Sequence, residues 1–89
     1  SEFSLSQNYP NPFNPETRIK FGLPKNINVN LTLYDITGKE IAVLLNEMKQ
    51  AGIYEFSLDT EKYSLSSGVY FYRLQAGNFT SVQKMILLK

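Results

Sequence analysis

Very few residues in this sequence could do chemistry. The 89-residue chain contains neither histidine nor cysteine. That composition excludes the usual general base, thiol nucleophiles, disulfides and the commonest ligands of transition metals. Two acidic groupings remain: Asp35, Thr37 and Glu40 surround one predicted turn, and Asp59 and Glu61 stand close together at the end of a predicted strand.

Neither grouping is well suited to a reaction or to a metal ion. The first offers three side chains, whereas Ca²⁺ takes about six to eight oxygen ligands, so we interpret Asp35 as a side-chain cap on its own turn. The second has no positioned nucleophile beside it and is interpreted as part of a solvated loop. We therefore predict a protein that is not an enzyme and that carries no cofactor.

The aromatic residues offer one other candidate surface. They could stack on a sugar, although aromatic residues on strands are more often part of the core. Phe71 and Phe79 are the exceptions, because we expect both on an outer face, where an exposed pair would indicate a docking surface. The whole set consists of Tyr54, Tyr63, Tyr70, Phe71, Tyr72 and Phe79.

Composition limits the partners and the size of the core. Nine basic and eight acidic side chains give a net charge of +1, so nothing points to nucleic acid or to an anionic membrane as partner. No apolar run approaches the roughly 20 residues of a membrane-spanning helix. A chain of this length should leave about 5,300 Å² of surface exposed, which favours a small sandwich or barrel without a deep cleft.

Two kinds of segment must position these residues. All four prolines fall in the first 24 residues, and we interpret N-Y-P-N-P-F-N-P (8–15) as a rigid lead-in that lays Tyr9 and Phe13 on the domain as a lid. From Thr17 onward, polar and apolar residues alternate, with turn signals about every 8–12 residues, as in antiparallel strands. The expected strands are 17–23, 29–33, 40–46, 53–59, 69–76 and 79–88, with a further one at 3–7.

This pattern predicts an all-β fold, an immunoglobulin-like antiparallel β-sandwich of about seven strands. In 69–76 we expect Tyr70, Tyr72 and Leu74 to face inward, with Tyr70 or Tyr72 donating its hydroxyl to a backbone carbonyl. The segment 40–46 is apolar on both faces. It suggests a strand covered from two sides or a short helix, and its β-branched residues favour the strand.

Four segments of the chain resemble the C-terminal sorting domain of type IX secretion cargo, in the type A variety found in Bacteroidetes and related bacteria. They occur in the order and with the spacing of that family, and together they span 8–89. They are N-Y-P-N-P-F-N-P-E-T-R-I-K-F-G-L-P (8–24), L-Y-D-I-T-G-K-E-I-A-V-L (33–44), L-S-S-G-V-Y-F-Y-R-L-Q-A-G (65–77) and K-M-I-L-L-K (84–89).

The resemblance implies an immunoglobulin-like sandwich that follows the N-terminal cargo domains of a larger exported protein. Residues 1–4 would then be a cloning remnant or linker, and 5–89 the sorting domain. The cargo would cross the inner membrane by the general secretory pathway and the outer membrane through a type IX translocon that recognises this domain. A sortase-like peptidase removes the domain in many members, and the cargo is released or attached to lipopolysaccharide. The expected location is therefore secreted or at the cell surface, reached through the periplasm and the outer membrane.

The resemblance also implies candidate recognition residues. They fall on the family's D-x-x-G turn, on its G-x-Y strand start and on its basic closing strand. They are Asp35 and Gly38, Gly68 and Tyr70, and Lys84 and Lys89, respectively.

Two further hypotheses follow from the residues themselves. The last strand, 79–88, is long and apolar, so we expect its outer edge to be available to a receptor strand or to an edge-strand dimer of two copies. The alternative function is an accessory module, appended to a secreted hydrolase, that binds carbohydrate or a cell-surface polymer.

Overall fold

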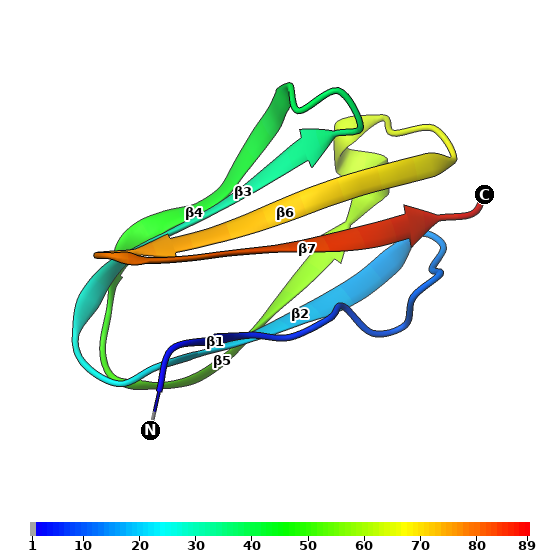
Figure 1. Ribbon diagram of the computed structural model, residues 1–89. Helices are drawn as coiled ribbons and strands as arrows, with labels where there is room; N and C mark the ends of the chain where they lie inside the picture. Colours follow the sequence, from blue (N-terminus) through cyan, green and yellow to red (C-terminus); the bar gives the residue numbers. More distant parts are fainter. Residues whose placement is uncertain (1) are drawn as a thin grey trace.

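The computed structural model describes residues 2–89 and shows two antiparallel β-sheets packed face to face (Figure 1). One sheet has three strands in the order β1-β2-β5, and the other has four in the order β4-β3-β6-β7. The predicted all-β sandwich of about seven strands is confirmed. The strands are β1 (Ser4–Leu5), β2 (Glu16–Leu23), β3 (Ile27–Asp35), β4 (Glu40–Lys49), β5 (Gly52–Asp59), β6 (Gly68–Ala76) and β7 (Phe79–Leu87), and a 3₁₀ helix, η1, covers Thr60–Tyr63.

Residue 1 of the expected remnant or linker 1–4 lies outside the described residues. Ser4 already pairs with Gly22 of β2, and the ring of Phe3 stacks on that of Phe79. The boundary at residue 5 stays a prediction. Within residues 2–89, no helix has the length and hydrophobicity to span a membrane.

The core forms because alternate side chains of each strand point to the same face. The apolar face of β2 meets those of β3, β6 and β7, and the exposed surface area is 5250 Å², close to the roughly 5,300 Å² expected from the chain length. The inward face predicted for β6 is confirmed. The fully buried core includes Ile19, Phe21, Leu23, Val29, Leu31, Leu33, Leu58, Tyr72, Leu74, Met85 and Leu87.

The apolar run 40–46 forms a strand, as predicted, but β4 is an edge strand and is not covered from two sides. It pairs only with β3, and the register of that pairing slips at two places. Each slip is a β-bulge, which changes the side to which the following residues point. Ile41, Leu44 and Leu45 can therefore all pack partly against the core, while Val43 is 47% exposed.

Phe71 lies on an outer face, as predicted, but the prediction for Phe79 is wrong. The two-residue turn at 77–78 pairs Ala76 with Phe79, and directly paired residues point to the same side of a sheet. Because Ala76 is fully buried, Phe79 also turns inward and packs against the core.

The β1–β2 connection (residues 6–15) contains the proline-rich lead-in and closes one lateral side of the sandwich. In Figure 1 it runs close to β7 before the chain enters β2. β4 and β5 are the edge strands of the two sheets on the opposite side.

Candidate recognition site

Most of the predicted recognition residues meet at one end of the four-stranded sheet, toward the right in Figure 1. Asp35 is the last residue of β3 and pairs with Tyr70 of β6. Gly68 begins β6 and pairs with the end of β7. Lys89 follows β7, and its backbone N–H donates to the Ser67 hydroxyl at 2.9 Å. Antiparallel pairing thus brings together residues that are far apart in the sequence.

Asp35 organises the turn between β3 and β4. Its Oδ1 atom accepts hydrogen bonds from the Thr37 N–H at 2.9 Å, the Thr37 hydroxyl at 2.6 Å and the Lys39 N–H at 3.0 Å. The bond from the Thr37 hydroxyl, followed by that from the Lys39 N–H, lowers the pKa of Asp35 below its ordinary value. Gly38 completes the turn with a φ of +87°, in the left-handed region that favours glycine. The interpretation of Asp35 as a turn cap is confirmed.

Metal binding finds no support at this turn. The three hydrogen bonds already engage the Oδ1 atom of Asp35. No cluster of acidic side chains in the described part of the chain is arranged to hold a metal ion.

Two tyrosines of β6 bond to backbone carbonyls. The Tyr70 hydroxyl donates to the Ser66 carbonyl at 2.7 Å, and the Tyr72 hydroxyl donates to the Ser6 carbonyl at 2.7 Å. The prediction that one of the two would do so is confirmed for both. Burial raises the pKa of Tyr72 to about 12, and its hydroxyl ties β6 to the start of the β1–β2 connection.

Lys84 lies close to the same end, because the next residue, Met85, pairs with Tyr70. It lies within β7, opposite Phe71, and its side chain is exposed. Its backbone carbonyl accepts a hydrogen bond from Gln7 Nε2 at 2.6 Å, so its main chain is already engaged by the β1–β2 connection.

The outer edge of β7 is occupied from Lys84 onward. The Phe13 N–H donates to the Ile86 carbonyl at 3.1 Å, and the Leu88 N–H donates to the Phe13 carbonyl at 3.0 Å. Asn11 Oδ1 accepts from the Ile86 N–H at 2.9 Å. The expectation that this edge is available for strand pairing is therefore wrong for 84–88, because a segment distant in sequence already bonds to it.

The same connection also bonds to the other sheet. Tyr9 and Arg18 of β2 exchange two backbone hydrogen bonds of 3.0 Å, and the Ser6 N–H donates to the Lys20 carbonyl at 2.9 Å. Between the two sheets, the Phe13 ring is only 3% exposed and belongs to the core. The part of the lid prediction that concerns Phe13 is confirmed.

The part that concerns Tyr9 is wrong, since this side chain is 82% exposed. Its pairing with Arg18 turns both side chains to the outer face of the three-stranded sheet. There they line an open hollow of about 290 Å³ together with Ser6, Gln7, Lys20 and Glu55. The sequence contains no period-two signal in the lead-in, so the hollow was not predictable.

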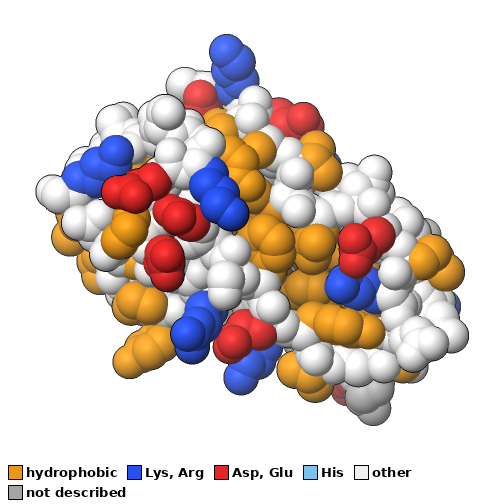
Figure 2. Space-filling view, turned by 180° about the vertical axis from the view of Figure 1, so that it is seen from behind, with side chains coloured by type: hydrophobic (Ala, Val, Ile, Leu, Met, Phe, Trp, Pro, Cys, Tyr) orange, Lys and Arg blue, Asp and Glu red, His pale blue; other side chains and the backbone are white. Residues whose placement is uncertain are grey.

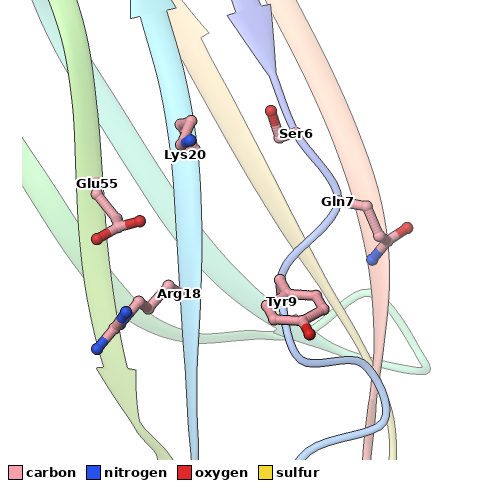
Figure 3. A pocket seen from close by; sticks show the side chains of 6 residues that line it. All are labelled: Ser6, Gln7, Tyr9, Arg18, Lys20 and Glu55. Carbon is pink, nitrogen blue, oxygen red and sulfur yellow. The ribbon is translucent and has the colours of Figure 1, made fainter.

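The hollow offers hydrogen-bonding groups rather than a reaction centre. Figure 3 shows Arg18, Lys20 and Glu55 on neighbouring strands, while Gln7 points away toward β7. These groups can hold a polar ligand, but the described residues that line the hollow include no nucleophile bonded to a base. A second hollow of about 230 Å³ lies on the other side of Tyr9 and is also lined by Glu16 and Ser57.

The opposite lateral side of the sandwich is open. Seen from behind, apolar side chains gather in a band across the molecule (Figure 2). The partly exposed apolar residues of the two edge strands include Leu44 and Leu45 of β4 and Tyr54 and Phe56 of β5. Within residues 2–89, no further segment pairs with the outer edge of either strand.

Comparison with known proteins adds a family and a fold. The family described as secretion system C-terminal sorting domain matches residues 7–88. The crystal structure of dimeric latent PorU from Porphyromonas gingivalis is similar, with a TM-score of 0.70 and 23% identity. The match covers 97% of this chain and 9% of that one, so this chain corresponds to a small part of PorU and shares the fold of that part. No curated protein matches the chain.

Proposed function

The chain belongs to the family of secretion system C-terminal sorting domains, and on that premise we propose that a type IX translocon recognises it in its folded form. Domains of this family are sorting signals for secretion through the outer membrane and are generally non-catalytic. The observation that carries the proposal is the family match over residues 7–88, nearly the whole chain. This match favours a sorting signal over an accessory binding module.

We assign two roles to the candidate recognition residues. Four of them shape the end of the four-stranded sheet through a turn cap, two positive φ angles and a hydroxyl bonded to a backbone carbonyl. The two lysines have exposed side chains and contact the translocon. The shaping residues are Asp35, Gly38, Gly68 and Tyr70, and the contacting residues are Lys84 and Lys89.

The fate of the cargo is part of the proposal. Cargo domains precede this domain, and a sortase-like peptidase cuts the linker upstream of Leu5. The cargo is then released or attached to lipopolysaccharide at the cell surface. An edge-strand dimer would form through β4 or β5, because the outer edge of β7 is already bonded by the β1–β2 connection.

A reporter fusion tests the proposal. A reporter with a signal peptide for the general secretory pathway is fused to the N-terminus of the 89-residue chain and expressed in a bacterium with a working type IX system. We expect the reporter outside the cell or on its surface, and in the periplasm when the domain or the translocon is removed. A fused reporter that stays in the periplasm would overturn the proposal.

The role of the lysines is tested by Lys84→Ser and Lys89→Ser together. This pair is preferable to deletion of 84–89, because deletion would remove the fully buried Met85 and Leu87 from the core and unfold the domain. Export should fall while the melting temperature of the purified chain stays within a few degrees of the wild-type value. Full export of the double variant would remove both lysines from the recognition site.

A further inference from the structure

The outer face of the four-stranded sheet carries side chains in regular rows. No other described segment lies over this face in Figure 1, and cross-strand pairing aligns its outward residues. The first row is Glu40, Tyr34, Phe71 and Lys84, the second is Val43, Thr32, Arg73 and Val82, and the third is Asn46, Asn30, Gln75 and Thr80.

The first two rows form an apolar and aromatic surface, the outer patch, which consists of Tyr34, Val43, Phe71, Arg73 and Val82. Val43 and Val82 are 47% and 53% exposed, and the other three are half-buried. Thr32 lies beneath the neighbouring side chains and is only 1% exposed. The side chains of the patch are therefore closely packed against one another, and their outer surface faces solvent.

Arg73 lies at the centre of the patch, and no acidic side chain in the described part of the chain forms an ion pair with it. Its guanidinium carbon is 5.2 Å from the centroid of the Tyr34 ring, a cation–π arrangement that holds the group beside Tyr34. Its Nε atom is buried and has no hydrogen-bond partner among residues 2–89. Lys49–Glu47 is the ion pair present within residues 2–89, so the guanidinium keeps its capacity to bind a carboxylate.

Basic residues predominate among the outward charges of the patch and its immediate surroundings. The outward residues of β3, β6 and β7 include Arg73 and Lys84 and no acidic residue, and Glu40 stands at the far corner on β4. The outer face of the three-stranded sheet differs, because Arg18 and Lys20 are there balanced by Glu16 and Glu55. Arginine and aromatic residues within an apolar surround are typical of the energetically important centre of protein interfaces.

We propose that the outer patch docks a protein surface that sets an Asp or Glu carboxylate against Arg73 and packs apolar side chains on Tyr34, Phe71 and Val82. A carboxylate would supply the bidentate acceptor that the guanidinium lacks. The inference rests on the proposed function, since the partner that we assign belongs to the type IX export machinery.

Val82→Glu is the principal test, because Val82 pairs directly with Arg73. The new carboxylate would neutralise the guanidinium within the domain, and an opposite-charge cross-strand pair preserves stability. Export of the reporter fusion should fall about tenfold or more, while the purified chain melts at or above the wild-type temperature. The matched control is Ile53→Glu on β5, which adds the same charge at a position 68% exposed on the other sheet and should be exported normally.

Arg73→Gln is a second variant that removes the charge and adds no acid. Its export should also fall about tenfold, whereas Arg18→Gln on the other sheet should be exported like the wild type. Normal export of both Val82→Glu and Arg73→Gln beside an exported wild-type fusion would overturn this inference and leave the proposed function intact. Failure of the wild-type fusion would overturn the proposed function itself.

The remaining outcomes concern specificity and an alternative occupant. Equal losses in Val82→Glu and Ile53→Glu would overturn the inference, because any added charge would then impair export. A dimer of the purified wild-type chain in sedimentation equilibrium that Val82→Glu abolishes would make a second copy the occupant, and would overturn it as well.

Discussion

The two lateral sides of the sandwich differ in whether a further segment bonds to the strands there. On the closed side, the β1–β2 connection bonds to β2 through Tyr9 and to β7 through Phe13, so it links the two sheets. On the open side, within residues 2–89, β4 and β5 have no such segment, and apolar side chains reach the surface (Figure 2).

This difference shows how the edge of β7 can be protected by a segment far from it in sequence. An exposed, apolar edge strand invites pairing with other chains, and β7 is apolar and lies near the end of the sequence. The β1–β2 connection bonds to its outer edge from Lys84 to Leu88. On the open side, β4 instead contains two bulges, which are a common protection of free edges. We therefore expect substitutions on the closed side to cost more stability.

The largest effect is expected for Phe13→Ala. The ring is 3% exposed between the two sheets, so its removal should lower the free energy of unfolding by about 3–5 kcal/mol. Phe56→Ala on the open side removes a partly exposed ring and should cost less than half as much. Urea denaturation of the purified chain measures both values, and equal losses would contradict the distinction between the sides.

The next effect is a loss of stability in alkali. The pKa of the buried Tyr72 is raised from 10.0 to about 12, so between these values the unfolded chain loses the phenol proton and the folded chain keeps it. The contribution of Tyr72 to the free energy of unfolding is complete below pH 10. It is lost as the pH rises toward 12, at up to about 1.4 kcal/mol for each pH unit.

Tyr72→Phe should reduce this alkaline loss while it leaves the Ser6 carbonyl without its partner. The measurement is the free energy of unfolding in urea at several pH values from 9 upward. A variant with the same alkaline slope as the wild type would show that Tyr72 is not its source.

A smaller effect is expected from the buried polar contacts of the closed side. Asn8 is 2% exposed, and its Nδ2 atom donates to the Thr17 hydroxyl at 2.9 Å and to the Pro10 carbonyl at 3.0 Å. Asn8→Ala should cost about 1–3 kcal/mol, because it leaves buried polar groups with fewer partners. Asn46 accepts an exposed bond of 3.2 Å from Asn28 on the open side, so Asn46→Ala should change stability by less than about 0.5 kcal/mol. A cost for Asn46→Ala that matches that of Asn8→Ala would refute the comparison.

The smallest difference is expected between two glycines that begin strands, one in each sheet. Gly68 at the start of β6 and Gly52 at the start of β5 have φ angles of +155° and +153°, which side chains rarely adopt. Gly68→Val and Gly52→Val should each cost more than about 1 kcal/mol, because the strain arises in the backbone itself. Thermal melting checks both variants, and an unchanged melting temperature for either would dismiss the strain at that position.

Strand positions could be predicted because their signal is local. Alternation places Ile19, Phe21 and Leu23 of β2 on one face whatever the strand pairs with, and the same holds for Tyr70 and Tyr72 of β6. Family membership was predictable for a similar reason, since it rests on motifs and their spacing along the chain.

The surfaces could not be predicted in the same way. Tyr9 is exposed because its backbone pairs with Arg18. The lead-in has no alternation of polar and apolar residues from which this pairing could be predicted. The isolated Arg73 became visible only when cross-strand pairing placed Thr32 and Val82 beside it. Composition counts charges, but it does not show which of them lack a partner.

By itself the sequence determined the all-β class, most of the strands, the turn at Asp35 and the family, because backbone preference and side-chain alternation act between near neighbours. Only the tertiary structure decided which strand edges are free, which side chains share a face and which charge stands alone. These properties depend on pairing between distant segments, such as Phe13 with Leu87, and such pairing is selected by the packing of the whole chain rather than by any local stretch of it.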